Sequence, residues 1–403
     1  MKSSKSQIHS HVYRIPELQF DDQRLTSFSG LILFQALFQK LELKERMRKC
    51  FRHLNVSPIY GHHVVMLWLV VHLLLGFRRF RDSDYYHDDP IVCRTLGVRK
   101  VPDVSTLSRT LSSADQKSFD ETRNLSKDLV MNRLVEEALA RVTLDFDGSV
   151  QSTKRHAEGS AVGYNKKKKG ARSYYPLFCT VAQTGQFLDF LHRPGNVHDS
   201  NGSIDFMTGC FDTVENSMPT AKIETRSDSA FFSDKTVQMM DGRGVEFTIS
   251  VPFERFAILK QMIEDRQRWN VLDHRWSFFE SDWKPESWDE KYRFIFIRQQ
   301  VHKQTKGPLQ LDLFIPISHD YDYKVIVTNK TSGAKKVLEF HNGRGAQENI
   351  IGEAKDDMQL DYIPMRTLIG NQLFCTASIL AHNLGRELQM QAYERDRGTT
   401  EKR

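Results

Sequence analysis

The sequence predicts an α/β protein with a helical N-terminal domain and a β-rich insertion, and three observations lead to this prediction. Apolar residues recur at helical spacing between positions 20 and 140. From residue 140 onward, short runs of alternating apolar and polar residues predict strands, with helical segments between them. Four of the five tryptophans then gather between residues 269 and 288, among further strand-like runs.

Composition and charge limit the class of protein. A chain of 403 residues is long enough for two or three domains. Its 39% hydrophobic and 27% charged residues argue against a disordered chain and against a membrane protein. The 57 Lys and Arg outnumber the 51 Asp and Glu, and the resulting charge of +6 permits an anionic partner such as nucleic acid.

Cysteine usage and the longest apolar stretch indicate the compartment. The five cysteines are odd in number and show no C-x-x-C spacing, which argues against a secreted disulfide framework and favours the cytoplasm. The apolar stretch 64–77 contains 14 residues. A membrane span needs about 20, so this stretch is expected to form a buried helix and no membrane partner is expected.

Residues 1–138 are expected to form the helical N-terminal domain and to bind DNA. Asp103 can cap a short helix whose outward side carries small polar residues and Arg109. Such a helix fits the second helix of a helix-turn-helix motif, with Arg109 toward DNA. An ordinary helical bundle with a solvated face is the alternative.

Residues 139–245 predict the first part of the α/β core. Alternation over 142–147 places Asp145 and Asp147 on the same face of one strand. A hairpin, a helix, a fourth strand that ends at Asp228 and a second helix follow. The whole order, three strands, helix, strand, helix, insertion and helix, matches a ribonuclease-H-like fold, in which acidic residues from strand ends and from a later helix meet.

The remaining chain divides into three parts. Residues 246–325 predict the β-rich insertion, 326–390 the second part of the core, and 391–403 a polar tail. The strand-like runs of the insertion and the adjoining core are Phe247–Val251, Tyr292–Ile297, Leu309–Ile315 and Lys324–Thr328.

Three carboxylates are candidate ligands for Mg²⁺, which prefers oxygen donors. Asp147 and Asp228 end separate strands, and Glu348 lies on the helix after the insertion. Two such ions can stabilise both the attacking and the leaving oxygen of a phosphodiester displacement. Asp145 shares the face of Asp147 and stays an alternative, although the turn at Gly148 favours Asp147.

The helix that carries Glu348 also carries two cations at helical spacing. Arg344, Glu348 and Lys355 are spaced by 4 and 7 residues and therefore share one stripe of the helix. A cation on that stripe would lie near DNA phosphate. A solvated salt-bridge face is the alternative.

Four segments carry a resemblance to a known family. They are LDFDGSV (144–150), GYNKKKKGARSYYPL (163–177) with RPGN (193–196), TRSDSAFFS (225–233), and RGAQENIIGEAK (344–355). In this order they resemble the DDE transposases of bacterial insertion sequences, specifically the group-1 DDE domain. The resemblance covers most of the chain.

The resemblance implies an enzyme that binds the terminal inverted repeats of its insertion sequence and catalyses DNA cleavage and strand transfer. The implied triad, which would hold Mg²⁺ or Mn²⁺, is Asp147, Asp228 and Glu348. Arg344 and Lys355 match the arginine and lysine of the family's Y-R-E-K signature. The signature's tyrosine is replaced by His341, which can still stack or donate a hydrogen bond to DNA.

The implied partners are the double-stranded DNA of the transposon ends and of the target, and a second copy of the chain, because two ends must be joined. A protein associated with the bacterial nucleoid follows from this. The tryptophan-bearing insertion resembles one that holds a flipped base in relatives, while a packed core is the alternative. A catalytically inactive descendant that only binds DNA is the alternative for the whole protein.

A run of basic residues lies between the predicted strands of the core. The cations are Lys166, Lys167, Lys168 and Lys169, with Lys154, Arg155 and Arg172 nearby. As contacts to the DNA backbone they would make binding strongly salt-dependent. A solvated loop is the alternative.

Overall fold

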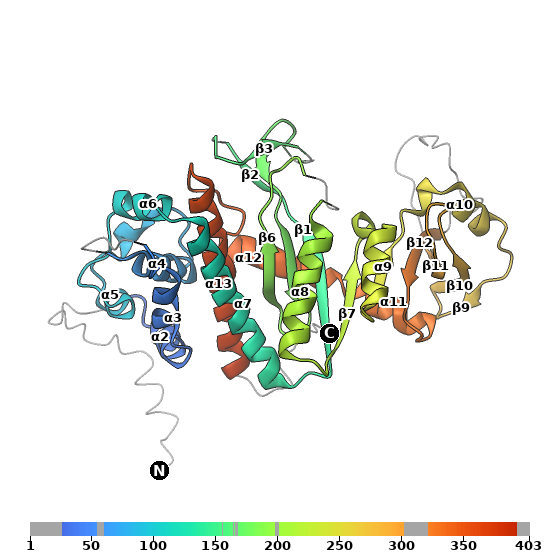
Figure 1. Cartoon of the computed structure of the whole chain (residues 1–403), viewed down its shortest axis with the longest axis horizontal. Helices are drawn as coiled ribbons and strands as arrows, with labels where there is room; N and C mark the ends of the chain where they lie inside the picture. The colour runs from blue at the N-terminus through green and yellow to red at the C-terminus, as the bar shows by residue number, and fades with distance from the viewer. Residues whose placement is uncertain are drawn as a thin grey trace, which may run out of the picture.

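The computed structural model describes residues 26–54, 60–154, 156–163, 165, 168–197, 201–301 and 321–392. A nine-stranded mixed sheet runs through its centre in the order β6-β5-β1-β7-β8-β12-β11-β10-β9. Helices cover the sheet on both faces, and a helical region lies at one end of the molecule while the last four strands lie at the other (Figure 1).

The core part of the sheet is built around β1 (Arg141–Gly148). This strand pairs antiparallel with β5 (Leu177–Val181), which forms the predicted hairpin with β6 (Gln186–Leu191). On its other side β1 pairs in parallel with β7 (Lys222–Ser227). Five consecutive residues of β1 are buried because helices pack on both faces of the sheet.

One difference from the sequence prediction concerns β8 (Glu246–Ser250). The sequence predicts this strand at the start of the insertion, but β8 pairs in parallel with β7 and so extends the core sheet. The strands beyond it, β12 (Tyr321–Thr328), β11 (Tyr292–Gln300), β10 (Trp276–Trp283) and β9 (Asn270–Val271), continue the same sheet in antiparallel fashion. The predicted strand over 309–315 lies outside the described residues.

Two hydrophobic clusters hold the core sheet between its helices. On one side α8 (Ser203–Ser217) and α9 (Asp234–Gly242) share a cluster with the inward residues of β1, β7 and β8. On the other side α7 (Gln116–Glu137) and α13 (Leu368–Ala392) pack on the phenylalanines of β5 and β6.

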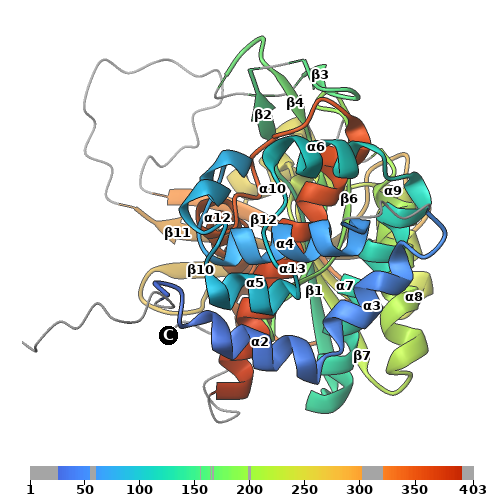
Figure 2. The same ribbon diagram turned by 90° about the vertical axis from the view of Figure 1, so that its left-hand side faces the viewer.

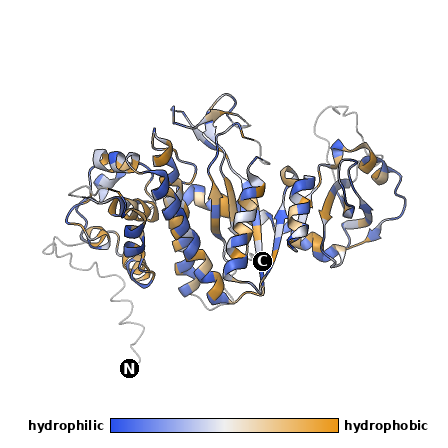
Figure 3. Ribbon diagram, viewed as in Figure 1, coloured by the Kyte–Doolittle hydropathy of each residue, from blue (hydrophilic) through white to orange (hydrophobic). Residues whose placement is uncertain are grey.

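The N-terminal helices share their core with α13. They are α2 (Leu31–Lys40), α3 (Leu43–Cys50), α4 (His62–Leu74), η1 (Phe80–Tyr85), α5 (Pro90–Leu96) and α6 (Val104–Ser112). The predicted buried helix is α4, which is apolar on all sides and lies against α13 (Figure 2). Apolar colour fills α4 and the central strands, whereas the outward helix faces are hydrophilic (Figure 3). The residue-138 boundary therefore does not separate two hydrophobic cores.

Three further groups of elements surround the sheet. A small sheet joins β2 (Gln151–Thr153), β4 (Arg172–Tyr174) and β3 (Ala161–Val162) above the end of β1. The short helices η2 (Ser229–Phe231), η3 (Phe253–Arg255) and α10 (Ala257–Glu264) follow strands β7 and β8. Helices α11 (Ala334–Asn342) and α12 (Gly345–Asp357) follow β12.

Trp283 and Trp288 of the insertion pack against other aromatic rings. Trp288 is buried against Phe232, and Trp283 contacts Phe294 edge to face at a centroid distance of 5.0 Å. These contacts fit the core interpretation of both side chains. Across the described residues, no helix is both long and apolar enough to cross a membrane.

Candidate active site

Asp147 and Asp228 lie at the carboxyl ends of two neighbouring parallel strands. In the register of β1 and β7, Phe146 is paired with Ser227, so the next residue of each strand is one of the two aspartates. The Asp147 carboxylate accepts a hydrogen bond from the amide of Gly148 at 2.8 Å. Asp228 accepts one from the amide of Ala230 at 3.0 Å and thereby caps η2. Adjacent parallel strands thus bring together two carboxylates that lie 81 residues apart.

Glu348 reaches the same edge of the sheet through Arg344. The Arg344 guanidinium lies 3.8 Å from Asp147 Oδ2 and 3.3 Å from Glu348 Oε1, so one cation contacts both carboxylates. The Glu348 side chain is 63% exposed. The predicted stripe of α12 therefore faces the end of β1.

The donor chemistry at this edge fits a hard divalent cation, since all three candidate ligands supply carboxylate oxygens. Within the described parts of the chain, however, no three His, Cys, Asp or Glu side chains are close enough together to hold a metal ion. Glu348 is directed to Arg344 instead. In the structure Arg344 contacts both Asp147 and Glu348, and the three candidate carboxylates are not gathered into a metal site.

Asp145, the alternative to Asp147, is engaged in the interior. It is completely buried, and its two oxygens accept hydrogen bonds from Arg226 Nε at 2.8 Å and Nη2 at 2.6 Å. Burial raises the pKa of Asp145, and the Arg226 guanidinium opposes that rise. This bidentate pair favours Asp147 as the carboxylate of β1 that is available to a ligand.

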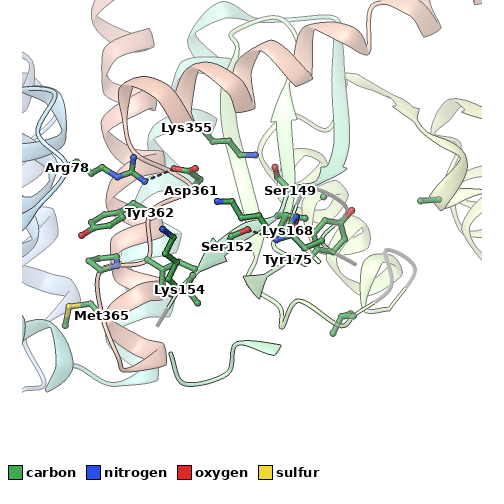
Figure 4. Close-up of a pocket in the computed structure, with 18 of the residues that line it drawn as sticks. Arg78, Ser149, Ser152, Lys154, Lys168, Tyr175, Lys355, Asp361, Tyr362 and Met365 are labelled. Carbon is green, nitrogen blue, oxygen red and sulfur yellow. Dashed lines mark hydrogen bonds and ion pairs between the residues drawn. The ribbon is translucent and has the colours of Figure 1, made fainter. Parts of the chain in front are cut away.

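A cleft of about 1,760 Å³ opens beside the two aspartates. It is lined by residues that directly follow each of them, Gly148 and Ser149 after β1 and Ser229 and Ala230 after β7. Among the residues that the structure describes, its charged lining consists of seven cations, Arg78, Arg79, Arg81, Lys154, Lys168, Arg255 and Lys355, and one carboxylate, Asp361. Figure 4 shows lysines from separate segments around the same space. This charge suits a polyanionic ligand.

The predicted DNA contacts have different positions. Lys168 and Lys355 line the cleft. Lys169 is exposed next to Lys168, whereas Lys166 and Lys167 lie outside the described residues. Arg172 is tied to Ser160, whose hydroxyl and carbonyl oxygens both accept hydrogen bonds from its guanidinium.

The predicted recognition helix contributes to the cleft through Ser108 of its predicted outward side and through Val104, whereas Arg109 is not among the lining residues. Arg109 is exposed on α6, where its Nε donates to the carbonyl of Ser105 at 3.3 Å. The cleft is lined instead by Val104 and Ser108 of the same helix.

His341 does not have the position expected of a DNA contact. The side chain is 1% exposed, and its Nδ1 and Nε2 form hydrogen bonds with Thr248 Oγ1 at 3.0 Å and Ser250 Oγ at 2.9 Å. Burial, with the nearby cations, lowers the pKa of His341 well below its usual value. The prediction is therefore corrected: both ring nitrogens are used to hold α11 against β8.

The arginines of the N-terminal region were missed by the sequence argument. Arg78 lies 3.7 Å from Asp361 and 4.8 Å above the ring of Tyr362, which fixes this segment against the loop after α12. Arg79 and Arg81 are exposed and line the cleft. The run Arg-Arg-Phe-Arg at 78–81, directly after the apolar stretch 64–77, is the signal for these residues in the sequence.

The strand order and the acidic strand ends define a ribonuclease-H-like α/β core, as the sequence predicts. The profile of the transposase DDE domain group 1 matches residues 10–401, so the chain belongs to this family of transposases. The assignment to the group-1 DDE domain, made from the four sequence segments, is thereby confirmed. Members of this family use a divalent metal.

Solved transposase structures resemble the chain at low identity. The piggyBac transposase synaptic complex with hairpin DNA matches 93% of this chain and 79% of that chain, with 10% identity and a TM-score of 0.42. The Drosophila P element transposase strand transfer complex matches 56% of this chain and 51% of that chain, with 12% identity and a TM-score of 0.27. The Mos1 transposase paired-end complex with left transposon end matches 48% of this chain and 60% of that chain, with 8% identity and a TM-score of 0.20. A comparison with curated protein sequences finds no match.

Proposed function

We propose that this transposase binds the terminal inverted repeats of its own mobile element and catalyses metal-dependent DNA cleavage and strand transfer. The observation that carries the proposal is the pair of carboxylates, Asp147 and Asp228, on adjacent strand ends beside a cleft whose described lining carries seven cations. A chain of phosphodiesters is the polyanion that fits such a cleft.

Asp147, Asp228 and Glu348 are the proposed ligands of Mg²⁺, for which Mn²⁺ can substitute. When bound, the metal supplies positive charge to the attacking and leaving oxygens of the phosphodiester. Water attacks one phosphodiester and displaces its 3′ oxygen, which leaves a 3′-hydroxyl and a 5′-phosphate. The 3′-hydroxyl then attacks the phosphorus of a second phosphodiester and displaces the 3′ oxygen there, so one P–O bond forms and one breaks.

The cations of the chain orient the DNA in this proposal. Lys355 and Lys168 hold phosphates within the cleft. Arg344 contacts two of the proposed ligands in the structure, and it becomes available to phosphate once Glu348 binds metal. Because two transposon ends must be joined, we propose a dimer on DNA, acting at the nucleoid.

An excision assay tests this function. The gene with its natural flanks is offered to the wild type, to Glu348→Gln and to the control Glu353→Gln, and joined flanks are detected by amplification. Glu353 is a suitable control because it lies on the same helix but pairs with Arg386 at 2.5 Å. Excision by the wild type and the control, but not by Glu348→Gln, supports the proposal.

The same assay addresses the alternative of an inactive descendant. If no variant excises the element, yet the wild type binds the flanking DNA, the protein is a DNA-binding derivative. If Glu348→Gln excises normally, Glu348 is not the third carboxylate.

A further inference from the structure

Each of the two strands that lead to Asp147 and Asp228 carries a second charged residue, two positions before the aspartate. Asp145 precedes Asp147 by two residues on β1, and Arg226 precedes Asp228 by two residues on β7. Residues two apart in a strand share a face. Asp145 and Arg226 are also direct partners in the β1–β7 register. They therefore form a pair beneath the two candidate ligands.

This pair is buried and bidentate. Asp145 is 0% exposed and Arg226 is 7% exposed, and two hydrogen bonds of 2.8 and 2.6 Å join them. Two parallel N–H···O bonds fix the relative orientation of both side chains as well as their separation. The contact thereby locks β1 to β7 next to the proposed metal site.

The same pair also holds the helical segment that carries Glu348. Arg226 Nη1 donates to the carbonyl oxygen of Phe340 at 3.2 Å, at the end of α11. Gln347, which directly precedes Glu348, is fully buried, and its Nε2 donates to the carbonyl oxygen of Asp145 at 2.8 Å. The end of α11 is thus attached to the Arg226 side chain, and the start of α12 is attached to the backbone of β1 at Asp145.

Gly343 shows how closely this turn approaches Arg226. A Cβ atom added at Gly343 would lie 2.0 Å from Arg226 Nη1. Only glycine leaves room for the guanidinium at this point, because any larger residue must displace either Arg226 or the turn.

We propose that Asp145, Arg226 and Gln347 are positioning residues, a frame that holds the first turn of α12, which carries Glu348, at the strand ends of Asp147 and Asp228 and so determines the affinity of the site for its divalent metal. This inference rests on the proposed function. Buried ion pairs contribute little net stability compared with apolar residues of similar size. A geometric task therefore explains this pair better than a contribution to folding.

The test uses two variants of the frame and one control pair. Asp145→Leu/Arg226→Met replaces both charges together, so no single charge is left buried. Gln347→Met removes the hydrogen bond to β1 and also a buried amide oxygen that has no hydrogen-bond partner, so it tests the frame even if the double variant does not fold. The control is Arg133→Met/Glu387→Leu, another buried bidentate pair, which joins α7 to α13 and in which Arg133 also contacts Glu136 and Glu137.

The readouts are Mn²⁺ binding by electron paramagnetic resonance, binding of the flanking duplex in EDTA, cleavage at saturating Mn²⁺, and the thermal midpoint. We expect both frame variants to bind the duplex like the wild type but to bind Mn²⁺ about tenfold more weakly. Cleavage should fall about 100-fold, as expected for ligands displaced by about 1 Å. The control pair should change only the thermal midpoint.

Two results would overturn the frame. One is Mn²⁺ affinity within twofold of the wild type in the frame variants that fold, and the other is an equal loss of Mn²⁺ affinity in the control pair. Asp147→Asn separates this failure from a failure of the proposed function. If Asp147→Asn also binds Mn²⁺ normally, or the wild type binds none, the metal site itself is wrong.

Discussion

Neutralising Arg79 and Arg81, two arginines of the N-terminal region that line the cleft, should weaken DNA binding and make it less dependent on salt. Arg79 and Arg81 line the cleft and are exposed, whereas Arg78 is held by Asp361. If each of the seven lining cations that the structure describes neutralises one phosphate, the slope of log K against log salt is about −6.3. Arg79→Gln/Arg81→Gln should reduce it to about −4.5. Raising salt from about 50 to 200 mM would then weaken binding roughly 500-fold instead of roughly 6,000-fold.

The assay is fluorescence anisotropy with the labelled flanking duplex across this salt range, in EDTA so that no cleavage occurs. Arg94→Gln/Arg99→Gln is the matched control, because both arginines are exposed in the same N-terminal region and neither lines the cleft. Its slope should equal that of the wild type. Equal slopes for all three proteins would refute the assignment of the cleft to DNA. If both variants reduced the slope by the same amount, the effect would come from net charge in general and not from the cleft.

Three further predictions concern catalysis, acid stability and the turn before α12. Glu348→Gln should bind the flanking duplex normally but cleave it at least about 100-fold more slowly in Mg²⁺, measured on gels; normal cleavage would exclude Glu348. Burial lowers the pKa of His192 to about 4, so below the usual value of 6.5 the unfolded chain takes up the proton first. The free energy of unfolding should therefore fall by up to about 1.4 kcal/mol for each pH unit between 6.5 and 4. His192→Phe, which preserves a ring beside Tyr174, should remove this contribution to the pH dependence of stability, measured by urea titration at several pH values. An unchanged pH dependence would show that His192 titrates normally. Gly343→Ala should slow cleavage without changing duplex affinity, since the added methyl displaces Arg226; cleavage at the wild-type rate would show that the turn adapts freely.

Much of the fold follows from local patterns in the sequence. Alternation predicts β1 and the β5–β6 hairpin, and the all-round apolar surface of α4 predicts its burial, because each pattern reports which faces of an element meet the core. The positions of Asp147 and Asp228 at strand ends follow in the same way. Partners distant in the chain are not encoded in such patterns, so the parallel pairing of β8 with β7 was not predicted.

The choice between Asp145 and Asp147 shows where local reasoning stops. The alternation of the strand places both carboxylates on one face, but it does not show which of them is buried. Burial of Asp145 is decided by its pairing with Arg226, which lies 81 residues away in the chain. His341 is similar: its sequence position suggests a DNA contact, while two hydroxyls of β8 give its ring nitrogens buried partners.

The sequence by itself determined the family, the α/β class and the three candidate carboxylates, because motifs and periodicity are properties of neighbouring residues. The tertiary structure decided which carboxylate is buried, which histidine is inaccessible, and which cations line the cleft. The arginines at 78–81 meet Lys154 and Lys355 only because the N-terminal helices pack on α13. Such meetings depend on burying shared apolar surface between distant segments, and no local pattern records that burial.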